Sequence, residues 1–373
     1  MQRFDIFAGF VTVFIAVMVI FFPAKSIHAE GRGLKKAVFI RPDSDDQFWN
    51  LMETVMQAAA HDLGVTLDVH HINEDHFRMV QKARQIVDSA DKPDVVFLEA
   101  LGSSDFKAIK IFDDAGIDVF TLNTKPDPKF GKPREKYKHW IGQMNPDDHL
   151  AGRMIAERLY AAARSKSKDS TEKIEMVAIQ GSPRVSPSDT RLAGLYDVME
   201  KYDRLDLRKV VEGYWSEEPS QKAASALLKQ YPDLDIIWAV NDSTAIGAVK
   251  AIEASGLKAG KDVMVAGIDW LPETFPYIED GRITASLGGH FMESAWALIL
   301  AYDYKNGHDF AGTAGTEIAS SMEIIDGSNI KKYGEKLSAM DWESVDFRGF
   351  TKMHNPALQS YDFNVLDALD QTS

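Results

Sequence analysis

The chain has 373 residues and a mass of 41.6 kDa, a length that predicts two or three domains rather than one small core. Hydrophobic residues make up 45% and charged residues 26%, which is typical of a globular protein and argues against a disordered or fibrous chain. The formal net charge of −14 argues against nucleic acid as a partner, and the absence of cysteine excludes disulfides, thiol catalysis, Cys-ligated zinc and iron–sulfur clusters.

The first 29 residues have the pattern of a secretory signal. The uncharged apolar run 7–22 follows Arg3 and precedes a small-residue end at Ala29. A retained membrane anchor is the alternative, but the run is shorter than the roughly 20 apolar residues that a helical span needs. We therefore expect export to the periplasm with cleavage after Ala29, and without a cysteine at that point a lipid anchor is excluded.

Short runs rich in Val and Ile recur in the first half of the mature chain. They are residues 37–44, 65–72, 94–100 and 118–124. Helical periodicity lies between them, as in residues 48–63, where apolar side chains fall on one face. Strands that alternate with helices predict βαβ units and a parallel sheet covered on both faces.

The same pattern starts again in the second half. A clear helix start is expected at residues 145–148, with Asn145 as the N-cap and Pro146 in the first helical position. The apolar runs that follow are residues 174–181, 207–214, 235–242, 262–269 and 283–289. This predicts two α/β halves joined near residues 142–145. Trp140, Trp238 and Trp296 lie inside strand or helix patterns and are expected in the core.

Polar and aromatic residues gather where the predicted strands end. Open parallel sheets bind ligands outside the carboxyl ends of their strands, so these residues mark a candidate site. They are Asp46, Phe48, Trp49, Glu99, Asn123, Arg191, Trp215, Asn241 and Asp269. Carboxylates, amides and tryptophans together favour a hydroxyl-rich ligand whose apolar C–H surfaces are covered by aromatic rings.

Several of these motifs, in this order, resemble the ribose-type periplasmic solute-binding proteins of ABC transporters. The motifs are DDQFW after the first strand, IQGSPRVSPSDTRLAGL, WAVNDSTAIGAVKAIEASG, and VAGID followed by ITASLGG. The resemblance covers residues 35 to about 335. It implies the type I periplasmic binding protein fold, with two parallel-sheet α/β lobes joined by a three-stranded hinge. Lactose-repressor-type regulators share this fold but begin with a helix-turn-helix, whereas this chain begins with an export signal.

The resemblance also implies domain limits. Residues 35–142 and about 290–310 would form the N-terminal lobe, and residues 143–289 and about 311–335 the C-terminal lobe. Residues 336–373 would be a C-terminal extension, whose aromatic residues either dock a partner or, as we expect, wrap one lobe.

The family's cleft residues map onto this chain residue by residue. The aromatic pair of the first strand falls on Phe48 and Trp49, with Asp46 as a polar partner. Arg191 and Asp269 would bind several sugar oxygens in fixed directions, because a guanidinium is a fork of donors and a carboxylate an acceptor. Trp49 and Trp215 would sandwich the ring. Asn241 belongs to the Asn-Asp pair, in which Asp242 either contributes to the cleft or only caps a helix.

Two departures indicate a different solute from ribose. Asn123 and Thr124 stand where the ribose binders have an Asp-Arg pair, and Gly288-Gly289-His290 replaces a ribose-type glutamine. His290 is therefore included among the candidate ligand-binding residues. Trp270, which follows Asp269, either gates the pocket or fills the hinge.

Other kinds of site find little support. His70, His71, Asp75 and His76 match no zinc spacing, the glycine motifs are misplaced for phosphate binding, and no nucleophile elbow or HExxH pair occurs. An enzyme would need Asp269 and Asp46 as its acid and base, the only such pair that the cleft offers. We expect no catalytic residues, no metal and no cofactor.

The sequence leaves two biological roles open. The first is the binding component of an ABC importer for a sugar or polyol, with a permease and an ATPase as partners. The alternative is a periplasmic sensor that presents a small signal molecule to a membrane receptor kinase. In both cases we expect a monomer that closes on its ligand.

Overall fold

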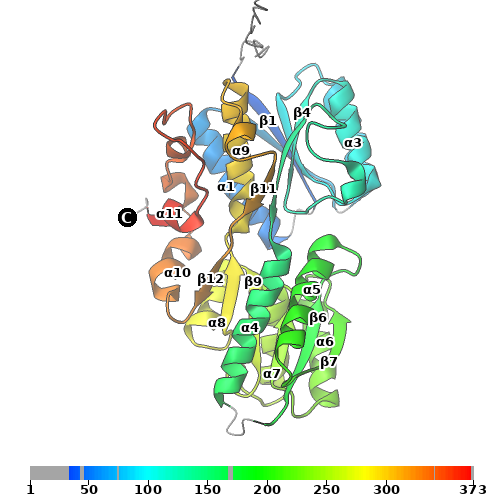
Figure 1. Ribbon diagram of the computed structural model, residues 1–373, viewed down its shortest axis with the longest axis vertical. Coiled ribbons are helices and arrows are strands. Elements are labelled where there is room, and N and C mark those ends of the chain that lie inside the picture. Colours follow the sequence, from blue (N-terminus) through cyan, green and yellow to red (C-terminus); the bar gives the residue numbers. More distant parts are fainter. Residues whose placement is uncertain (1–32, 43–45, 74, 167–170, 340, 371–373) are drawn as a thin grey trace, which may run out of the picture.

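The computed structural model describes residues 33–370 except 43–45, 74, 167–170 and 340, and it has two lobes, one above the other (Figure 1). Each lobe contains a six-stranded sheet with helices packed against it. This confirms the predicted α/β class with two lobes. The predicted signal segment, residues 1–29, lies outside the described residues.

The first lobe has a parallel sheet in the strand order β11-β5-β4-β3-β1-β2. Its main elements are β1 (Lys36–Arg41), α1 (Gln47–Leu63), β2 (Thr66–His71), α2 (His76–Asp88), β3 (Val95–Glu99), α3 (Ser103–Asp114), β4 (Asp118–Leu122), β5 (Trp140–Pro146), α9 (Glu293–Lys305) and β11 (Glu317–Ser320). Alternate residues of β1 face opposite layers: Phe39 packs into the core with α1 and α9, and Ile40 into the core with α2 and α3.

The second lobe repeats this plan in the order β12-β10-β9-β8-β6-β7, with only β12 antiparallel to its neighbour. Its main elements are α4 (Asp148–Lys166), β6 (Ile174–Gln180), α5 (Ser186–Lys201), β7 (Leu205–Glu212), α6 (Glu217–Gln230), β8 (Ile236–Ala239), α7 (Asp242–Ala254), β9 (Met264–Asp269), α8 (Phe275–Glu279), β10 (Ala285–Gly288), β12 (Glu323–Asp326) and α10 (Ile330–Ala339). Helices α4 and α5 pack together, as do α6 and α7.

Three segments connect the lobes as a hinge. The chain passes from β5 to α4 at residues 146–148, from β10 to α9 at residues 288–293, and from β11 to β12 at residues 320–323. These crossings confirm the expected three-stranded hinge. The expected core tryptophans are also confirmed, since Trp140 and Trp238 are fully buried and Trp296 is 2% exposed.

Strand β5 corrects the predicted helix start. Asn145 and Pro146 do not begin a helix; they end β5, where Pro146 pairs with Ser320 of β11. Helix α4 begins at Asp148, and the Asp147 side chain accepts a hydrogen bond of 2.9 Å from the backbone N–H of Leu150. Aspartate therefore takes the capping role that we assigned to asparagine.

The position of β11 corrects the expected domain limits. Residues 311–335 were all expected in the second lobe, but Glu317–Ser320 pairs with β5 in the first sheet. The third crossing comes after Ser320, so that only β12 and the residues following it belong to the second lobe. Short edge strands such as β11 have little hydrophobic pattern from which their sheet could be predicted.

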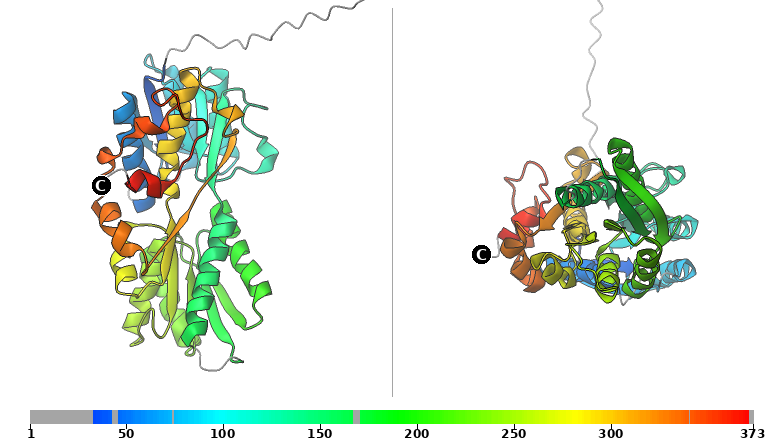
Figure 2. Two further views of the ribbon diagram at one scale, coloured as in Figure 1. Left: turned by 60° about the vertical axis from the view of Figure 1, so that its left-hand side comes forward. Right: turned by 90° about the horizontal axis from the view of Figure 1, so that it is seen from below.

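The C-terminal extension contacts both lobes rather than wrapping one. After α10, which packs on α8 of the second lobe, the chain forms the short 3₁₀ helices η5 (Trp342–Ser344) and η6 (Phe347–Phe350) against α1 of the first lobe. Helix α11 (Val365–Asp370) then returns to α10 (Figure 2). The extension is held at the hinge and on the first lobe by aromatic contacts: Trp342 packs edge to face on Phe291 of the second crossing, and Phe350 packs on Trp296 of α9.

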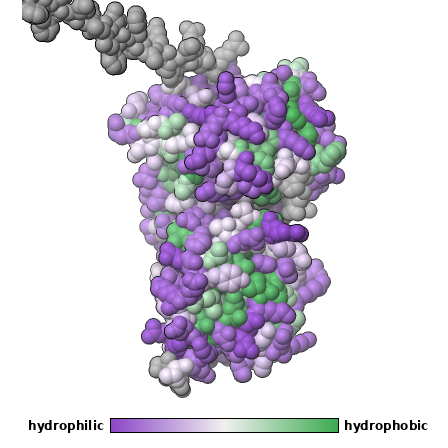
Figure 3. Space-filling model, turned by 45° about the vertical axis from the view of Figure 1, so that its right-hand side comes forward, coloured by the Kyte–Doolittle hydropathy of each residue, from purple (hydrophilic) through white to green (hydrophobic). Residues whose placement is uncertain are grey.

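Hydrophilic residues dominate the visible surface of the upper lobe, whereas a hydrophobic area lies on the lower lobe (Figure 3). Among the described residues, none of the helices has the length and hydrophobicity needed to cross a membrane.

Candidate functional site

Arg191 of α5 is buried in the second lobe, beside two carboxylates. Its side chain is 4% exposed; Nε donates to Oδ1 of Asp148 at 2.8 Å and Nη1 to the Val240 carbonyl at 3.0 Å. The same Nη1 lies 3.7 Å from Oδ1 of Asp269. Burial alone would lower the pKa of Arg191, but the two carboxylates outweigh it and raise the pKa. Arg191 is therefore a fixed cation, already oriented by protein groups.

Asp269 is the last residue of β9 and is 5% exposed. Burial raises the pKa of Asp269 well above its usual range despite the nearby Arg191, and the charges of Asp242 and Asp46 act in the same direction. Asp46 belongs to the first lobe and Asp269 to the second, and the influence of the Asp46 charge on the pKa of Asp269 shows that the two carboxylates lie near each other. A hydroxyl group of a ligand could satisfy such a carboxyl.

His290 lies on the second hinge crossing and is 1% exposed. Its Nε2 is 3.6 Å from Oδ1 of Asp269, and its ring packs on Phe48 with centroids 4.7 Å apart. Burial and the charge of Arg191 lower the pKa of His290 well below its usual range, so the ring is neutral. Nδ1 is buried and has no hydrogen-bond partner among the described residues.

Two predicted aromatic residues open helix α1. Phe48 and Trp49 are 9% and 8% exposed, and their rings contact each other edge to face with centroids 5.8 Å apart. Asp46 fixes this turn, because its carboxylate accepts a hydrogen bond of 3.1 Å from the backbone N–H of Trp49. At the other end, Gly64 ends the helix in the left-handed region at φ 65°.

Trp215 is held on the second lobe in the left-handed region at φ 62°. Its carbonyl accepts a hydrogen bond of 3.2 Å from Asn241 Nδ2, and the Arg191 guanidinium lies 5.7 Å from its ring. The side chain of Asn241 also caps α7, accepting from the Thr244 N–H at 3.0 Å. Trp215, Asn241 and Arg191 thus form one cluster; a sandwich of the ligand between Trp49 and Trp215 stays a prediction.

Glu99 and Asn123 form a second cluster, at the ends of β3 and β4. Oε1 of Glu99 accepts from Asn123 Nδ2 at 3.0 Å and from Thr124 Oγ1 at 2.5 Å. The backbone N–H of Asn123, which sits at φ 64°, donates to Glu293 Oε2 at 2.8 Å. Glu293 is fully buried at the start of α9 and also accepts from Ser320 Oγ of β11. This network links the cleft to two of the hinge crossings.

Asp242 does not cap α7. It is fully buried and accepts from the Leu271 N–H at 2.9 Å and from Ser286 Oγ at 2.8 and 2.9 Å. Burial raises the pKa of Asp242 to about 6. Trp270 is 1% exposed, donates from Nε1 to the Ser286 carbonyl at 3.0 Å and packs against Gly288. Of its two expected roles, filling the hinge is the one that this packing favours.

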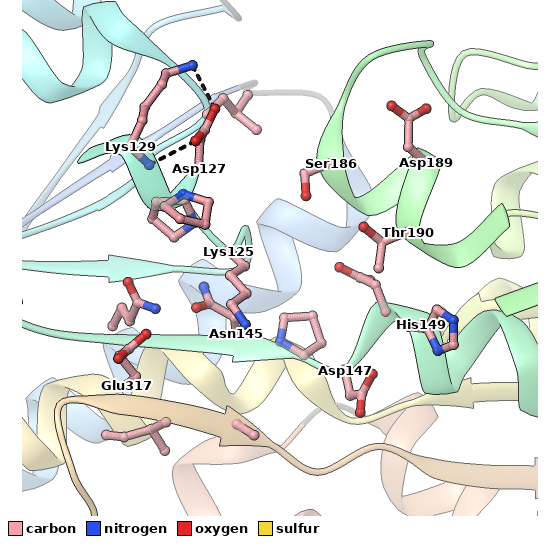
Figure 4. A pocket seen from close by; sticks show the side chains of 18 of the residues that line it. Lys125, Asp127, Lys129, Asn145, Asp147, His149, Ser186, Asp189, Thr190 and Glu317 are labelled. Carbon is pink, nitrogen blue, oxygen red and sulfur yellow. Dashed lines mark hydrogen bonds and ion pairs between the residues drawn. The ribbon is translucent and has the colours of Figure 1, made fainter. Parts of the chain in front are cut away.

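A cavity of about 870 Å³ opens between the lobes (Figure 4). Lys125 and Asn145 lie on the first-lobe side, and Ser186, Asp189 and Thr190 come from the start of α5 on the other. None of the ten predicted residues lines this cavity. The connection is Asp148, which lines the cavity and also binds Arg191, so the predicted cluster borders the cavity instead of forming its walls.

Sequence reasoning missed four polar residues of this region. They are Gln143, Asn145, Asp148 and Glu293. Gln143 and Asn145 lie in the second half of strand β5 and line the cavity, and Asn145 Nδ2 is buried without a partner among the described residues. Recognising β5 as a strand would have placed both at its carboxyl end, the position that we used to select the other candidates.

Two α/β lobes, three hinge crossings and polar and aromatic residues from both lobes define a two-lobed ligand-binding protein. The model of the periplasmic binding protein domain matches residues 37–309, and the chain belongs to this family.

Similar proteins fit this family assignment. The D-ribose/D-allose-binding protein of Pseudomonas aeruginosa is 28% identical over 273 residues, which cover 71% of this chain and 80% of the relative. A periplasmic sugar-binding protein from Pseudomonas fluorescens has a structure similar at a TM-score of 0.81, with 28% identity, covering 90% of this chain and 99% of that one. A solute-binding protein of Bacillus halodurans with bound myo-inositol shares the fold, with a TM-score of 0.69, 17% identity and 84% and 99% coverage.

Proposed function

We propose that this protein is the periplasmic substrate-binding component of an ABC importer and that it holds one sugar or polyol between its lobes. The observation that carries the proposal is the buried arrangement of Arg191 with Asp148 and Asp269 beside Trp215. Oriented donors and acceptors next to an aromatic face suit a ring with many hydroxyl groups. The names of the relatives, which mention ribose, allose and myo-inositol, support the same class.

Each lobe has its own part in this proposal. Arg191, Asn241 and Asp269 of the second lobe bind ring hydroxyls, and Phe48 and Trp49 of the first lobe cover the ring as the lobes close. His290 supplies Nδ1 from the hinge itself. A ligand that contacts both lobes binds the closed arrangement better than the open one, which is the condition for ligand-driven closure.

The partners and location follow from the same role. We infer that residues 1–29 direct the chain to the periplasm and are removed after Ala29, and that a permease with its ATPase accepts the solute. The role is binding without turnover: the polar groups of the cleft hold a ligand by hydrogen bonds and form no intermediate with it.

A thermal-shift screen of the mature protein tests the proposal. D-Ribose, D-allose, D-galactose, L-arabinose and myo-inositol are added one at a time. A solute at about 100 times its Kd stabilises the folded state by about 2.7 kcal/mol, which raises the melting temperature by several degrees. Native mass spectrometry detects a solute retained from expression. If no sugar or polyol shifts the melting temperature and none is retained, the proposal fails.

A further inference from the structure

Residues 341–370, here called the C-terminal strap, make an additional connection between the lobes. The strap starts beside α10 on the second lobe, runs over α1 and α9 of the first, and ends in α11 beside α10 again (Figures 1 and 2). After the three hinge segments, the chain thus passes between the two lobes twice more.

The middle part of the strap is anchored on α9 of the first lobe. Asp303 is fully buried and accepts hydrogen bonds from the backbone N–H groups of Lys352 at 2.7 Å and Met353 at 3.1 Å, and from Tyr361 Oη at 2.8 Å. Trp296 of α9 stacks on Phe363 with centroids 5.0 Å apart. A buried carboxylate with three donors from one segment fixes that segment firmly.

The second-lobe end is anchored by α11 on α10. Val365, Ala368 and Leu369 are buried, and Lys336 Nζ of α10 donates to the Leu369 carbonyl at 2.8 Å. Lys332 Nζ lies 3.4 Å from an Asp370 carboxylate oxygen. Apolar burial and a hydrogen bond therefore tie the strap to the lobe that carries Arg191 and Asp269.

The strap also contacts two of the three hinge crossings. A Cβ atom on Gly289 would lie 2.8 Å from Cγ1 of Val365, so α11 rests directly on the second crossing. Ser321 Oγ, on the third crossing, donates to the Phe363 carbonyl at 3.3 Å. Both contacts therefore lie on segments about which one lobe would rotate against the other.

We propose that the C-terminal strap restrains the hinge and favours the lobe arrangement of this structure over arrangements in which the lobes are further apart. The strap can keep its contacts to α9 and to α10 at the same time only while the distance between the two lobes stays as it is in this structure. In this arrangement Phe48, Arg191 and Asp269 are buried, so the restraint also prepares the cleft for its ligand. The effect on the cleft rests on the proposed function, whereas the restraint itself does not depend on it. If the protein binds a solute, its apparent affinity rises with the fraction of molecules in the binding-competent arrangement.

Single-molecule energy transfer tests the restraint without any ligand. The chain has no cysteine, so Lys107→Cys on α3 and Lys229→Cys on α6, both exposed, give one dye on each lobe. The full chain is compared with a chain that ends at Asn364, which lacks α11 but keeps Phe363. We expect truncation to shift the ligand-free population to lower transfer efficiency. Asp367→Asn, an exposed change on α11, is the matched control and should leave the efficiency unchanged.

A second variant keeps the test valid if the shortened chain folds poorly. Leu369→Ala loosens α11 in a chain of full length, and circular dichroism verifies that the lobes stay folded. It should shift the efficiency in the same direction by a smaller amount. An unchanged or higher efficiency in the folded variants overturns the proposal. Because no sugar is added, this result is independent of the thermal-shift screen, which can fail or succeed by itself.

Discussion

Nε of Arg191 donates a hydrogen bond of 2.8 Å to Oδ1 of Asp148, and this pair joins α5 to α4 where both helices border the interlobe cavity. The helices also approach closely, since a Cβ atom on Gly152 would collide with the Arg191 carbonyl. Arg191 therefore has two tasks. In the structure it neutralises a carboxylate that burial would otherwise leave unpaired, and in the proposed function its remaining donors bind the ligand.

Arg191→Ala should lower the free energy of unfolding by about 3–5 kcal/mol, because it leaves Asp148 buried without its cation. Urea unfolding followed by tryptophan fluorescence measures this loss. Adding Asp148→Asn should recover part of it, since the stranded charge is removed. Arg153→Ala, an exposed change on α4, is the control and should cost little. Equal stability of Arg191→Ala and the wild type would contradict the structural task of the pair.

Asp242 should make the stability depend on pH. Its pKa is about 6 in the folded protein, above the ordinary value of 3.8, so the folded state holds this proton more tightly than the unfolded state. The resulting stabilisation is complete below about pH 4 and is lost as the pH rises through 6. A difference of about two pKa units corresponds to about 3 kcal/mol.

Asp242→Asn tests this assignment through melting temperatures between pH 4 and 8. Asparagine does not titrate, so the variant should show a smaller decline between pH 4 and 7 than the wild type; the part that remains comes from other buried carboxyl groups such as Asp269, whose pKa is also raised. The difference between the two proteins should level off above about pH 7. Parallel curves for the two proteins would show that another group causes the decline.

Gly289→Ala should destabilise the protein for two separable reasons. The residue lies at φ 100°, which costs a side chain about 1–2 kcal/mol, and the new methyl group would meet Val365. Gly256→Ala is a matched control, because Gly256 has φ 88° but open space around it. In a Val365→Ala background the cost of Gly289→Ala should fall to that of Gly256→Ala, as read from chemical denaturation. If Val365→Ala gives no relief, α11 does not rest on the hinge.

Much of the fold could be predicted because its central strands, such as β1 and β3, are buried on both faces and therefore read as runs of apolar residues rich in Val and Ile. Strand β5 escaped notice because Trp140–Pro146 includes Gly, Gln, Asn and Pro, which read as a loop, and its Asn-Pro end resembles a helix start. Periodicity alone gave no sign that the third crossing would come after Ser320.

For the candidate site, the sequence identified residues at strand ends but not their partners. Arg191 was selected from its motif, whereas Asp148, its ion-pair partner, lies 43 positions earlier in the chain. Glu293 is 170 positions away from Asn123, whose backbone it binds. Such pairs depend on tertiary packing, for which spacing in one sequence carries no signal.

Isothermal titration calorimetry with the solute that gives the largest thermal shift tests the central claim most directly. The wild-type protein should bind one solute per chain. Asp269→Ala should weaken binding by roughly 10- to 100-fold, because losing a buried hydrogen-bonding carboxyl group costs about 1.5–3 kcal/mol. Asp233→Ala, an exposed change, should bind normally. If Asp269→Ala binds as tightly as the wild type, the ligand does not occupy the site around Arg191 and Asp269.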